Sequence, residues 1–387
     1  MHPFPIETLI IPSLLIFIVT FIVSLSFTGL FGTSTLVSTL KSGIFLFYYG
    51  AIFDGTYTFS DDIVYMEGGH DIIKSGINIL DIGSNWDYLA GISHGEHVTY
   101  YLYNAFAFYS FGYGYYAPVS LNVVLTVLIA WIGAIVAKRE FIFTRNSQIY
   151  FFIFLLLHPD ILAWSNIMNG KDILVLFLHV ILLLSFSLFF EKRWHLGAII
   201  ATCGCFVLFY LRFYVPLMFI SAFIFSNMSY KQLRTKLPYL LVGLLFAYFL
   251  LSRFNSHLVN YIYVLISENF VNPIFGLIRF ILTPVPFHTE TAYSFLDFPA
   301  LFHWLMFIPA YLGFRIVSKF RTKFSKFFIT YVLVFIALYS VFGKLQGPRH
   351  RVQLDYAWAV FQFIGISSIL AQGRYVRVTP VFRPYGY

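Results

Sequence analysis

The chain has 387 residues, of which 59% are hydrophobic, 21% are aromatic and 11% are charged, and its formal net charge is +8. Soluble globular domains average about 25% charged residues, so this composition excludes an ordinary soluble enzyme and predicts an all-α, polytopic integral membrane protein. We interpret residues 1–387 as one membrane domain. Basic residues are grouped in short loops between apolar runs, a distribution typical of membrane topology and not of nucleic-acid binding.

The N-terminal residues MHPFPIETLIIPSLL contain no Lys or Arg, and no obvious small-residue cleavage site follows their apolar stretch. We therefore expect a retained first helix and not a cleaved signal peptide. Apolar runs predict about ten transmembrane helices. Their expected ranges are 8–31, 117–137, 148–164, 172–190, 196–211, 214–227, 237–252, 300–318, 326–342 and 356–372. Cys203 and Cys205 fall within one run and are interpreted as small lipid-facing or helix-facing residues.

Alternate loops differ in charge, which orients the predicted helices. Lys and Arg residues gather around 138–145, 192–193, 231–236 and 315–326, and again in the tail after residue 373. Loops rich in Lys and Arg face the cytoplasm, so we expect both termini there and most acidic residues on the opposite face. The predicted location is a bacterial inner or plasma membrane with the active site on its extracytoplasmic side.

Two apolar stretches complicate this topology. Residues 34–53 could enter the membrane, but a lone crossing there would invert the later loops, so we predict that 34–53 and 98–116 are interfacial or re-entrant. Two long external segments follow from this assignment, at 32–116 and 253–299. The second reads as an amphipathic helix lying on the outer surface.

The first external segment contains adjacent aspartates, Asp61 and Asp62, followed by Tyr65. A carboxylate on this face could accept a proton from an incoming hydroxyl, with the second aspartate orienting the first or binding a divalent ion. His70-Asp71 and the run His94-Gly-Glu96-His97 offer further ligand atoms in the same loop. Their spacing matches no strong zinc signature, so no metal ligand is assigned and a divalent cation stays an option.

Cationic residues also occur at the external ends of predicted helices, against the topological bias. They are Lys171, Arg212, Arg349, His350 and Arg351. Arg and Lys in such places suit a phosphate or carboxylate ligand, and we predict a lipid-linked phosphate. Arg212 could instead extend to the lipid interface, residues 344–351 could form a solvated turn, and Asp172 could serve either the site or the dipole of the helix that it begins.

The stretch SDDIVYMEGGHDIIKSG resembles the first external loop of GT-C fold glycosyltransferases, membrane enzymes that use polyprenyl-phosphate sugars. Protein mannosyltransferase-like and aminoarabinose transferase-like enzymes belong to this group. The residues that match its pattern are Asp61, Asp62, Tyr65 and Gly76, and we assign Tyr65 to the predicted substrate- and phosphate-binding residues. Asn122, His158-Pro159, NGKDILVLF and GPRHRVQLDYAWAVFQFIG look similar to later landmarks in the same order.

The resemblance implies inverting transfer of a sugar from a polyprenyl-phosphate donor to a glycan, lipid or protein acceptor, with Asp61 as the first choice of catalytic base and Asp62 as the second. The gap before the aspartate pair is longer than in most relatives, and no large C-terminal soluble domain is expected, unlike in oligosaccharyltransferases. One alternative is a repeat-unit polymerase of polysaccharides that uses polyprenyl-diphosphate oligosaccharides. A second is a transporter or flippase for a lipid-linked substrate, and a third is a structural membrane subunit.

Overall fold

The computed structural model describes residues 2–77, 81–93, 97–141, 143–191, 193–228, 272–342 and 347–372, and every regular element in these ranges is a helix. Seven segments are long and apolar enough to cross a membrane, or eight if one bent pair is a single span. They are α1 (Ile6–Thr28), α2 (Phe31–Phe47) with η1 (Tyr48–Ile52), α6 (Tyr116–Glu140), α7 (Arg145–Leu156) with α8 (Pro159–Ile167), α9 (Asp172–Phe190), α17 (Lys323–Val341), and α18 (Pro348–Arg351), η5 (Val352–Leu354) and α19 (Asp355–Gln372) together. The predicted all-helical, membrane-embedded architecture is confirmed at this level.

The remaining helices are shorter. The predicted spans at 196–211 and 214–227 correspond to α10 (Trp194–Phe209) and α11 (Tyr214–Asn227), which have 16 and 14 residues. The bent pair joins η3 (Thr291–Leu296) and α15 (Asp297–Leu305) to α16 (Phe307–Ser318) with a bend of 53°. The predicted span at 237–252 lies outside the described residues.

The second long external segment, 253–299, is described from residue 272 onward. Its first described regular element is α14 (Pro273–Leu282), which begins where the side chain of Asn272 accepts the backbone N–H of Ile274 at 3.0 Å and where Pro273 occupies the first turn. α14 packs against α17 on one side and exposes Ile274 and Phe275 on the other. The rest of the predicted surface helix, 253–271, lies outside the described residues.

Residues 34–53, predicted to be interfacial or re-entrant, are long and apolar enough in the structure to be a candidate membrane span. They form most of α2 and η1, a continuous apolar helix of 22 residues that meets the length and composition of a membrane span. α1 ends at Gly29, whose φ of 71° provides the left-handed cap, and α2 then returns antiparallel to α1. The backbone N–H of Phe4 donates to the carbonyl of Tyr49 at 2.9 Å, which closes this hairpin at its far end. By contrast, residues 98–111 form a helix of only 14 residues, too short for a hydrocarbon core of about 30 Å.

The basic turns meet at one end of the bundle. Arg139, at the end of α6, pairs with Glu191 after α9 at 2.7 Å, and the ring of Phe141 lies 6.0 Å from that of Phe324 at the start of α17. Arg145, at the start of α7, donates to the carbonyl of Phe27 near the end of α1. α1 therefore begins at the opposite end of the bundle from these basic turns.

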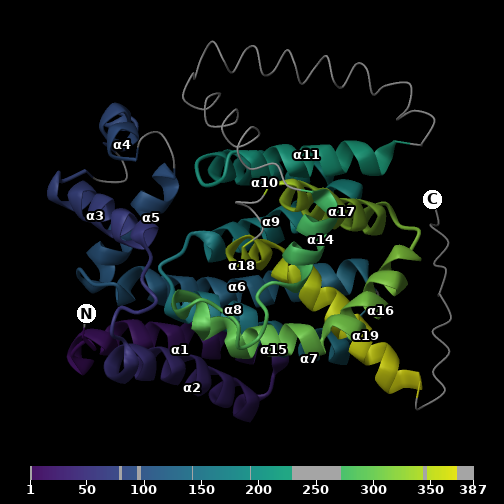
Figure 1. The fold of residues 1–387 in the computed structure, drawn as a ribbon, viewed down its shortest axis with the longest axis horizontal. Helices are drawn as coiled ribbons and strands as arrows, with labels where there is room; N and C mark the ends of the chain where they lie inside the picture. The colour runs from purple at the N-terminus through teal and green to yellow at the C-terminus, as the bar shows by residue number, and fades with distance from the viewer. Residues whose placement is uncertain are drawn as a thin grey trace.

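The two ends of the described chain lie at opposite ends of the bundle (Figure 1). α19 runs from the end where α1 begins toward the basic turns, where Phe363 contacts Phe143 at 5.4 Å. The prediction that both termini share one side stays a prediction, because residues 373–387 lie outside the described ranges. The Lys and Arg bias belongs to loops that follow residue 137, so a crossing by α2 would change the side of the N-terminus and leave the later loops in place.

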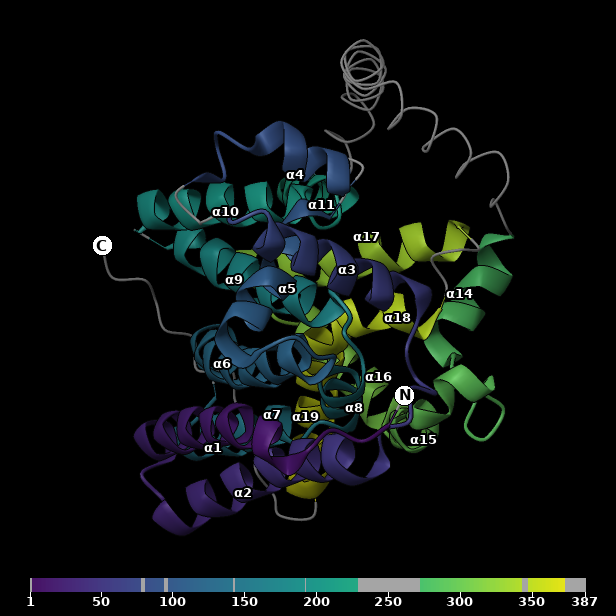
Figure 2. The ribbon, with the colours of Figure 1, turned by 90° about the vertical axis from the view of Figure 1, so that its left-hand side faces the viewer.

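Three helices from the first external segment gather at the end without basic turns: α3 (Ser60–Lys74), α4 (Trp86–Ile92) and α5 (Val98–Phe111). Figure 2 shows α3 and α5 crossing in front of the bundle. Two glycines let them pack closely, because a Cβ at Gly68 would lie 2.1 Å from the ring of Tyr101 and one at Gly69 would lie 2.8 Å from the Cβ of Asn104. This contact fixes α3, and with it Asp61 and Asp62, against the bundle.

Candidate functional site

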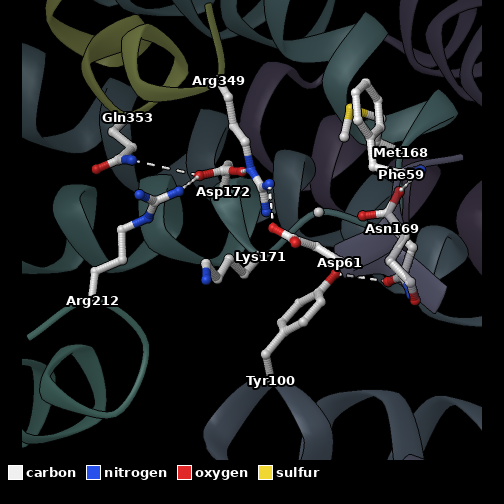
Figure 3. Close-up of polar contacts among 12 residues, drawn as sticks. Phe59, Asp61, Tyr100, Met168, Asn169, Lys171, Asp172, Arg212, Arg349 and Gln353 are labelled. Carbon is white, nitrogen blue, oxygen red and sulfur yellow. Dashed lines mark hydrogen bonds and ion pairs between the residues drawn. The ribbon is translucent and has the colours of Figure 1, made fainter. Parts of the chain in front are cut away.

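The candidate site lies at the end of the bundle that α3 and α5 cover, where four distant segments converge (Figure 3). The start of α3 contributes Asp61 and Asp62, and the turn between α8 and α9 contributes Lys171. Arg212 comes from the turn between α10 and α11, and Arg349 comes from α18. The sequence-predicted carboxylate pair and three of the predicted phosphate-binding cations therefore meet in one place.

Asp172, the first residue of α9, joins two of the arginines. Its Oδ2 accepts Arg349 Nε at 2.7 Å, and its Oδ1 accepts the guanidinium of Arg212. Gln353 Nε2 lies 3.5 Å from the same Oδ1. The carboxylate is 1% exposed, and its place at a helix N-terminus adds a favourable interaction with the helix dipole. Both roles left open by the sequence, in the site and at the helix dipole, therefore fall on this residue.

Arg349 connects this buried pair to the start of α3. Its Nη1 donates to Asp61 Oδ2 at 2.8 Å, across 288 positions of sequence. The Asp61 side chain is 51% exposed, the most accessible carboxylate in the cluster. Partial burial of the Asp61 carboxylate raises its pKa. The nearby charges of Arg349, Lys171 and His97 together lower it by more, so the pKa of Asp61 lies below its ordinary value. Asp61 is therefore ionised at neutral pH and open to solvent.

Asp62 faces the other way and is fully buried. Its Oδ2 accepts the hydroxyl of Tyr115 at 2.7 Å and the backbone N–H of Phe59 at 3.3 Å, which caps the first turn of α3. Burial raises the pKa of Asp62 to about 7, while the hydrogen bond from Tyr115 and the charge of Arg349 work against this rise. The position and contacts of Asp62 are those of an anchor for α3.

Lys171 is 4% exposed and donates from Nζ to the hydroxyl of Tyr65 at 2.8 Å. Within the part of the chain that the structure describes, no carboxylate lies within ion-pair distance of its ammonium group. Burial lowers the pKa of Lys171, and the neighbouring charges of Arg212 and Arg349 lower it further. A cation held among other cations without its own counter-ion is a place for an anionic ligand.

Two guanidinium nitrogens in the cluster have no acceptor among the described residues, Arg349 Nη2 and Arg212 Nε, and both are buried. Buried polar groups in folded proteins are almost always hydrogen-bonded, so each unpaired donor calls for a partner. With Lys171 beside them, these nitrogens form a set of donors that suits the oxygens of a phosphate.

The other two predicted phosphate-binding residues, Arg351 and His350, make different contacts. Arg351 turns away from the cluster, donates to Asp160 at 3.0 Å and to the carbonyl of Thr283, and is 1% exposed. Arg351 therefore pairs with a different buried carboxylate from Arg212 and Arg349, and its predicted phosphate-binding role stays a prediction. His350 lies beside Tyr339 with ring centroids 5.6 Å apart, and its Nδ1 has no partner among the described residues. His350 follows Arg349 in α18, and its predicted phosphate-binding role stays a prediction.

The expected alternative of a divalent cation finds no ligand set in the described ranges, where no group of three or more His, Cys, Asp or Glu residues could hold a metal. His70 stacks on Tyr113 with ring centroids 4.3 Å apart. His94 and Glu96, the other suggested ligands, lie outside the described residues.

Comparisons of the chain with models of protein families, with curated proteins and with solved structures find no significant match.

Sequence reasoning did not single out the polar network beneath Asp62. Asn169 donates from its amide to Asn104 Oδ1 at 2.8 Å and accepts the hydroxyl of Tyr100 at 2.8 Å, while its backbone N–H donates to Tyr115 at 3.0 Å. These residues hold the turn that leads to Lys171 against α3. The available signal was the presence of isolated asparagines in strongly apolar surroundings, since buried amides need partners.

Proposed function

We propose that the protein is a GT-C-type glycosyltransferase that transfers a sugar from a polyprenyl-phosphate donor to a glycan, lipid or protein acceptor. One observation carries the proposal: Arg349 links an exposed carboxylate, Asp61, to a buried cationic cluster whose spare donors face no acceptor in the described part of the chain. A proton acceptor next to a phosphate cradle is what such a transfer requires.

In the proposed reaction, Lys171, Arg349 and Arg212 hold the donor phosphate and Asp61 removes the proton from the acceptor hydroxyl. The acceptor oxygen then bonds to the anomeric carbon as the bond from that carbon to the phosphate oxygen breaks, and its electron pair stays on the phosphate. Donor binding gives Arg349 a second anion, which weakens its hold on Asp61 and makes that carboxylate a stronger base. Asp62 supports the reaction by fixing α3.

The proposed orientation places this site on the extracytoplasmic side. The basic turns gather at the opposite end of the bundle, as expected for cytoplasmic loops. Residues 1–7 contain no Lys or Arg, which agrees with an N-terminus on the same side as the site.

The test is a panel of undecaprenyl-phosphate pentoses and hexoses offered to the purified protein in lipid nanodiscs, with release of undecaprenyl phosphate as the readout. We expect turnover with at least one donor and its loss in Arg349→Gln. Turnover only with diphosphate-linked oligosaccharides would replace the proposal by the polymerase alternative. Movement of an intact lipid-linked substrate across the bilayer without transfer would replace it by a transporter.

A further inference from the structure

A second group of polar side chains lies inside the bundle, between α8, α15 and α19. Its members, called the buried acid cluster below, are His158 and Asp160 at the start of α8, His303 of α15, Arg351 of α18, and Asp355 and Gln362 of α19. Each of these residues is at most 2% exposed. Asp160 and Asp355 belong to two of the segments that are long and apolar enough to cross a membrane. Ionisable residues in such segments are rare and costly, and they are a first indication of a functional site.

The charges of this cluster do not balance when both carboxylates are ionised. Asp160 Oδ1 accepts Arg351 Nη2 at 3.0 Å, which forms one buried ion pair. The charges of both partners act on Asp355, so its carboxyl group lies beside this pair, yet in the described part of the chain it forms no ion pair of its own. A buried carboxylate without a counter-ion is strongly destabilised and takes up a proton instead. A proton on Asp355 makes its charge and those of the ion pair sum to zero.

The two histidines of the cluster add no charge to this sum. Nε2 of His303 donates to the carbonyl of Ile281 at 2.9 Å, and Nε2 of His158 donates to Gln362 Oε1 at 3.0 Å. Neither ring forms an ion pair with a carboxylate in the described ranges, so we treat both rings as neutral. In a neutral imidazole whose Nε2 carries the hydrogen, Nδ1 is an acceptor.

Six buried polar atoms in this region have no hydrogen-bond partner among the described residues. Nδ1 of His158 and of His303 can accept, the donors are Arg351 Nε, Gln362 Nε2 and Trp358 Nε1, and Asp355 Oδ2 accepts or donates according to whether it carries a proton. The ring of Trp358 lies 5.6 Å from that of His303 between centroids, so it belongs to the same region. Water suits such a mixture because each molecule donates and accepts, whereas a metal ion needs acceptors alone.

The segment that follows α14 connects the cluster with the protein surface. The carbonyl of Ile281 accepts His303, and the carbonyl of Thr283 accepts Arg351. Val285, two residues later, is exposed. A short stretch of chain therefore separates the buried acids from the outside, which gives a proton a route for exchange.

We propose that the buried acid cluster is a proton-binding site within the membrane domain, hydrated by internal water and holding one exchangeable proton on Asp355. Asp160 stays ionised beside Arg351, and the protonated oxygen of Asp355 donates its hydrogen bond within the cluster. Loss of this proton leaves one net negative charge in a buried place. Buried acids of this kind form the proton relays of membrane proteins. The proton site is independent of the proposed transfer, in which Asp61 is the base.

The test is infrared difference spectroscopy of the purified protein in lipid nanodiscs, in H2O and after exchange into D2O. A protonated carboxyl group has a C=O band that an ionised carboxylate lacks, and this band moves on deuteration. At neutral pH we expect the wild-type protein to show a component of this band that exchanges in D2O and is lost in Asp355→Asn. The matched control is Asp71→Asn, at an exposed aspartate of α3, which keeps the component. A folded Asp355→Asn with the complete wild-type band, or a component that does not exchange, would overturn the proposal.

Thermal unfolding is the second measurement, and it separates a proton from a metal ion. Asparagine has the shape of a protonated aspartate, so Asp355→Asn should keep the wild-type melting temperature. Asp160→Asn leaves Arg351 buried without its counter-ion and should lower it. Replacing the sodium and potassium of the buffer by choline should leave the wild-type protein unchanged. A fall for Asp355→Asn as large as that for Asp160→Asn would show that Asp355 is ionised, and a wild-type melting temperature that depends on sodium or potassium would assign the site to a metal cation; either result overturns the proton site.

Discussion

The two neighbouring aspartates at the start of α3 lie in different surroundings because of helix geometry. Successive residues in an α-helix point about 100° apart, so Asp61 and Asp62 cannot share one environment. The sequence predicted the pair and ranked Asp61 first as the base. The exposed position of Asp61 beside Arg349 agrees with that order, but the burial of Asp62 depends on Tyr115, which approaches from 53 positions away in the sequence. No local pattern contains that contact.

Asp62 should make the stability of the protein depend on pH. Its folded pKa is raised to about 7 from 3.8, so the folded protein binds this proton more tightly than the unfolded chain. The contribution is fully present below about pH 4 and is lost as pH rises to about 7. We expect thermal unfolding of Asp62→Asn in detergent to lose this pH dependence while the wild-type melting temperature falls across the window. Parallel curves for the two proteins would contradict the assignment.

Replacing Asp172 by a neutral residue should destabilise the protein more than neutralising any other residue of the cluster. Asp172→Asn leaves Arg212 and Arg349 buried without their shared counter-ion, and breaking a buried pair in this way costs about 3–5 kcal/mol. We expect a lower melting temperature and loss of phosphate binding. The double variant Asp172→Asn/Arg212→Gln should recover part of the stability, because one unpaired charge is removed. A melting temperature of Asp172→Asn equal to that of the wild type would show that the cluster does not need this carboxylate.

At the scale of helices, α16 and α19 are held in direct backbone contact by two glycines. A Cβ at Gly313 would lie 1.9 Å from the carbonyl oxygen of Phe361, and one at Gly365 would lie 1.9 Å from that of Pro309. Small residues at such crossings allow close packing of membrane helices. We therefore expect Gly313→Ala and Gly365→Ala each to destabilise the protein by about 1–3 kcal/mol.

The matched control for this prediction is Gly43→Ala in α2, where an added Cβ would meet no atom within 4 Å. Alanine is the better helix former by up to about 1 kcal/mol, so this variant should keep or raise the melting temperature. Equal effects of Gly43→Ala and Gly365→Ala would show that the α16–α19 contact is looser than described.

Most helices could be predicted from apolar runs, since length and composition alone identify a membrane span. Residues 34–53 were expected to be interfacial or re-entrant because they contain Lys41, several serines and tyrosines, which look interfacial in sequence. In the structure Lys41 is buried and donates to Thr126 Oγ1 at 2.7 Å, and Ser38 donates to the carbonyl of Ser34 at 2.6 Å. These polar groups are satisfied inside the bundle, which is how such residues are accommodated within a membrane.

For the whole molecule, a membrane crossing by α2 would place the N-terminus on the same side as the site. After Cys203 and Cys205 are replaced by alanine, single cysteines at Glu7, Leu30, Asp71 and Arg193 can be labelled with a membrane-impermeant maleimide. We expect labelling of Glu7→Cys and Asp71→Cys in intact cells, and of Leu30→Cys and Arg193→Cys only after permeabilisation. Protection of Glu7→Cys together with Arg193→Cys would restore the topology with both termini in the cytoplasm.

The assembly of the site required the whole fold. Each cation of the site could be recognised in the sequence because it lies at the predicted external end of a helix, where basic residues are uncommon. Their convergence depends on contacts between distant residues, such as that of Arg349 with Asp61, which lie 288 positions apart in the sequence. Arg351 lies two residues from Arg349, and the sequence alone does not distinguish the two. In the structure Arg351 forms an ion pair with Asp160. The two side chains leave α18 in different directions, so Arg349 meets Asp61 of α3 and Asp172 of α9 while Arg351 meets Asp160 of α8.

The most direct test of the central claim is the rate of transfer by Asp61→Asn beside Asp71→Asn, a neutralised carboxylate on an exposed position of the same helix. With a donor that the wild-type protein uses, Asp61→Asn should lower kcat about 10²–10⁴-fold, the usual contribution of a general base, while its melting temperature and phosphate binding are kept. Asp71→Asn should retain wild-type activity. Full activity of a folded Asp61→Asn would contradict the account, because the exposed carboxylate beside Arg349 would then not be the base.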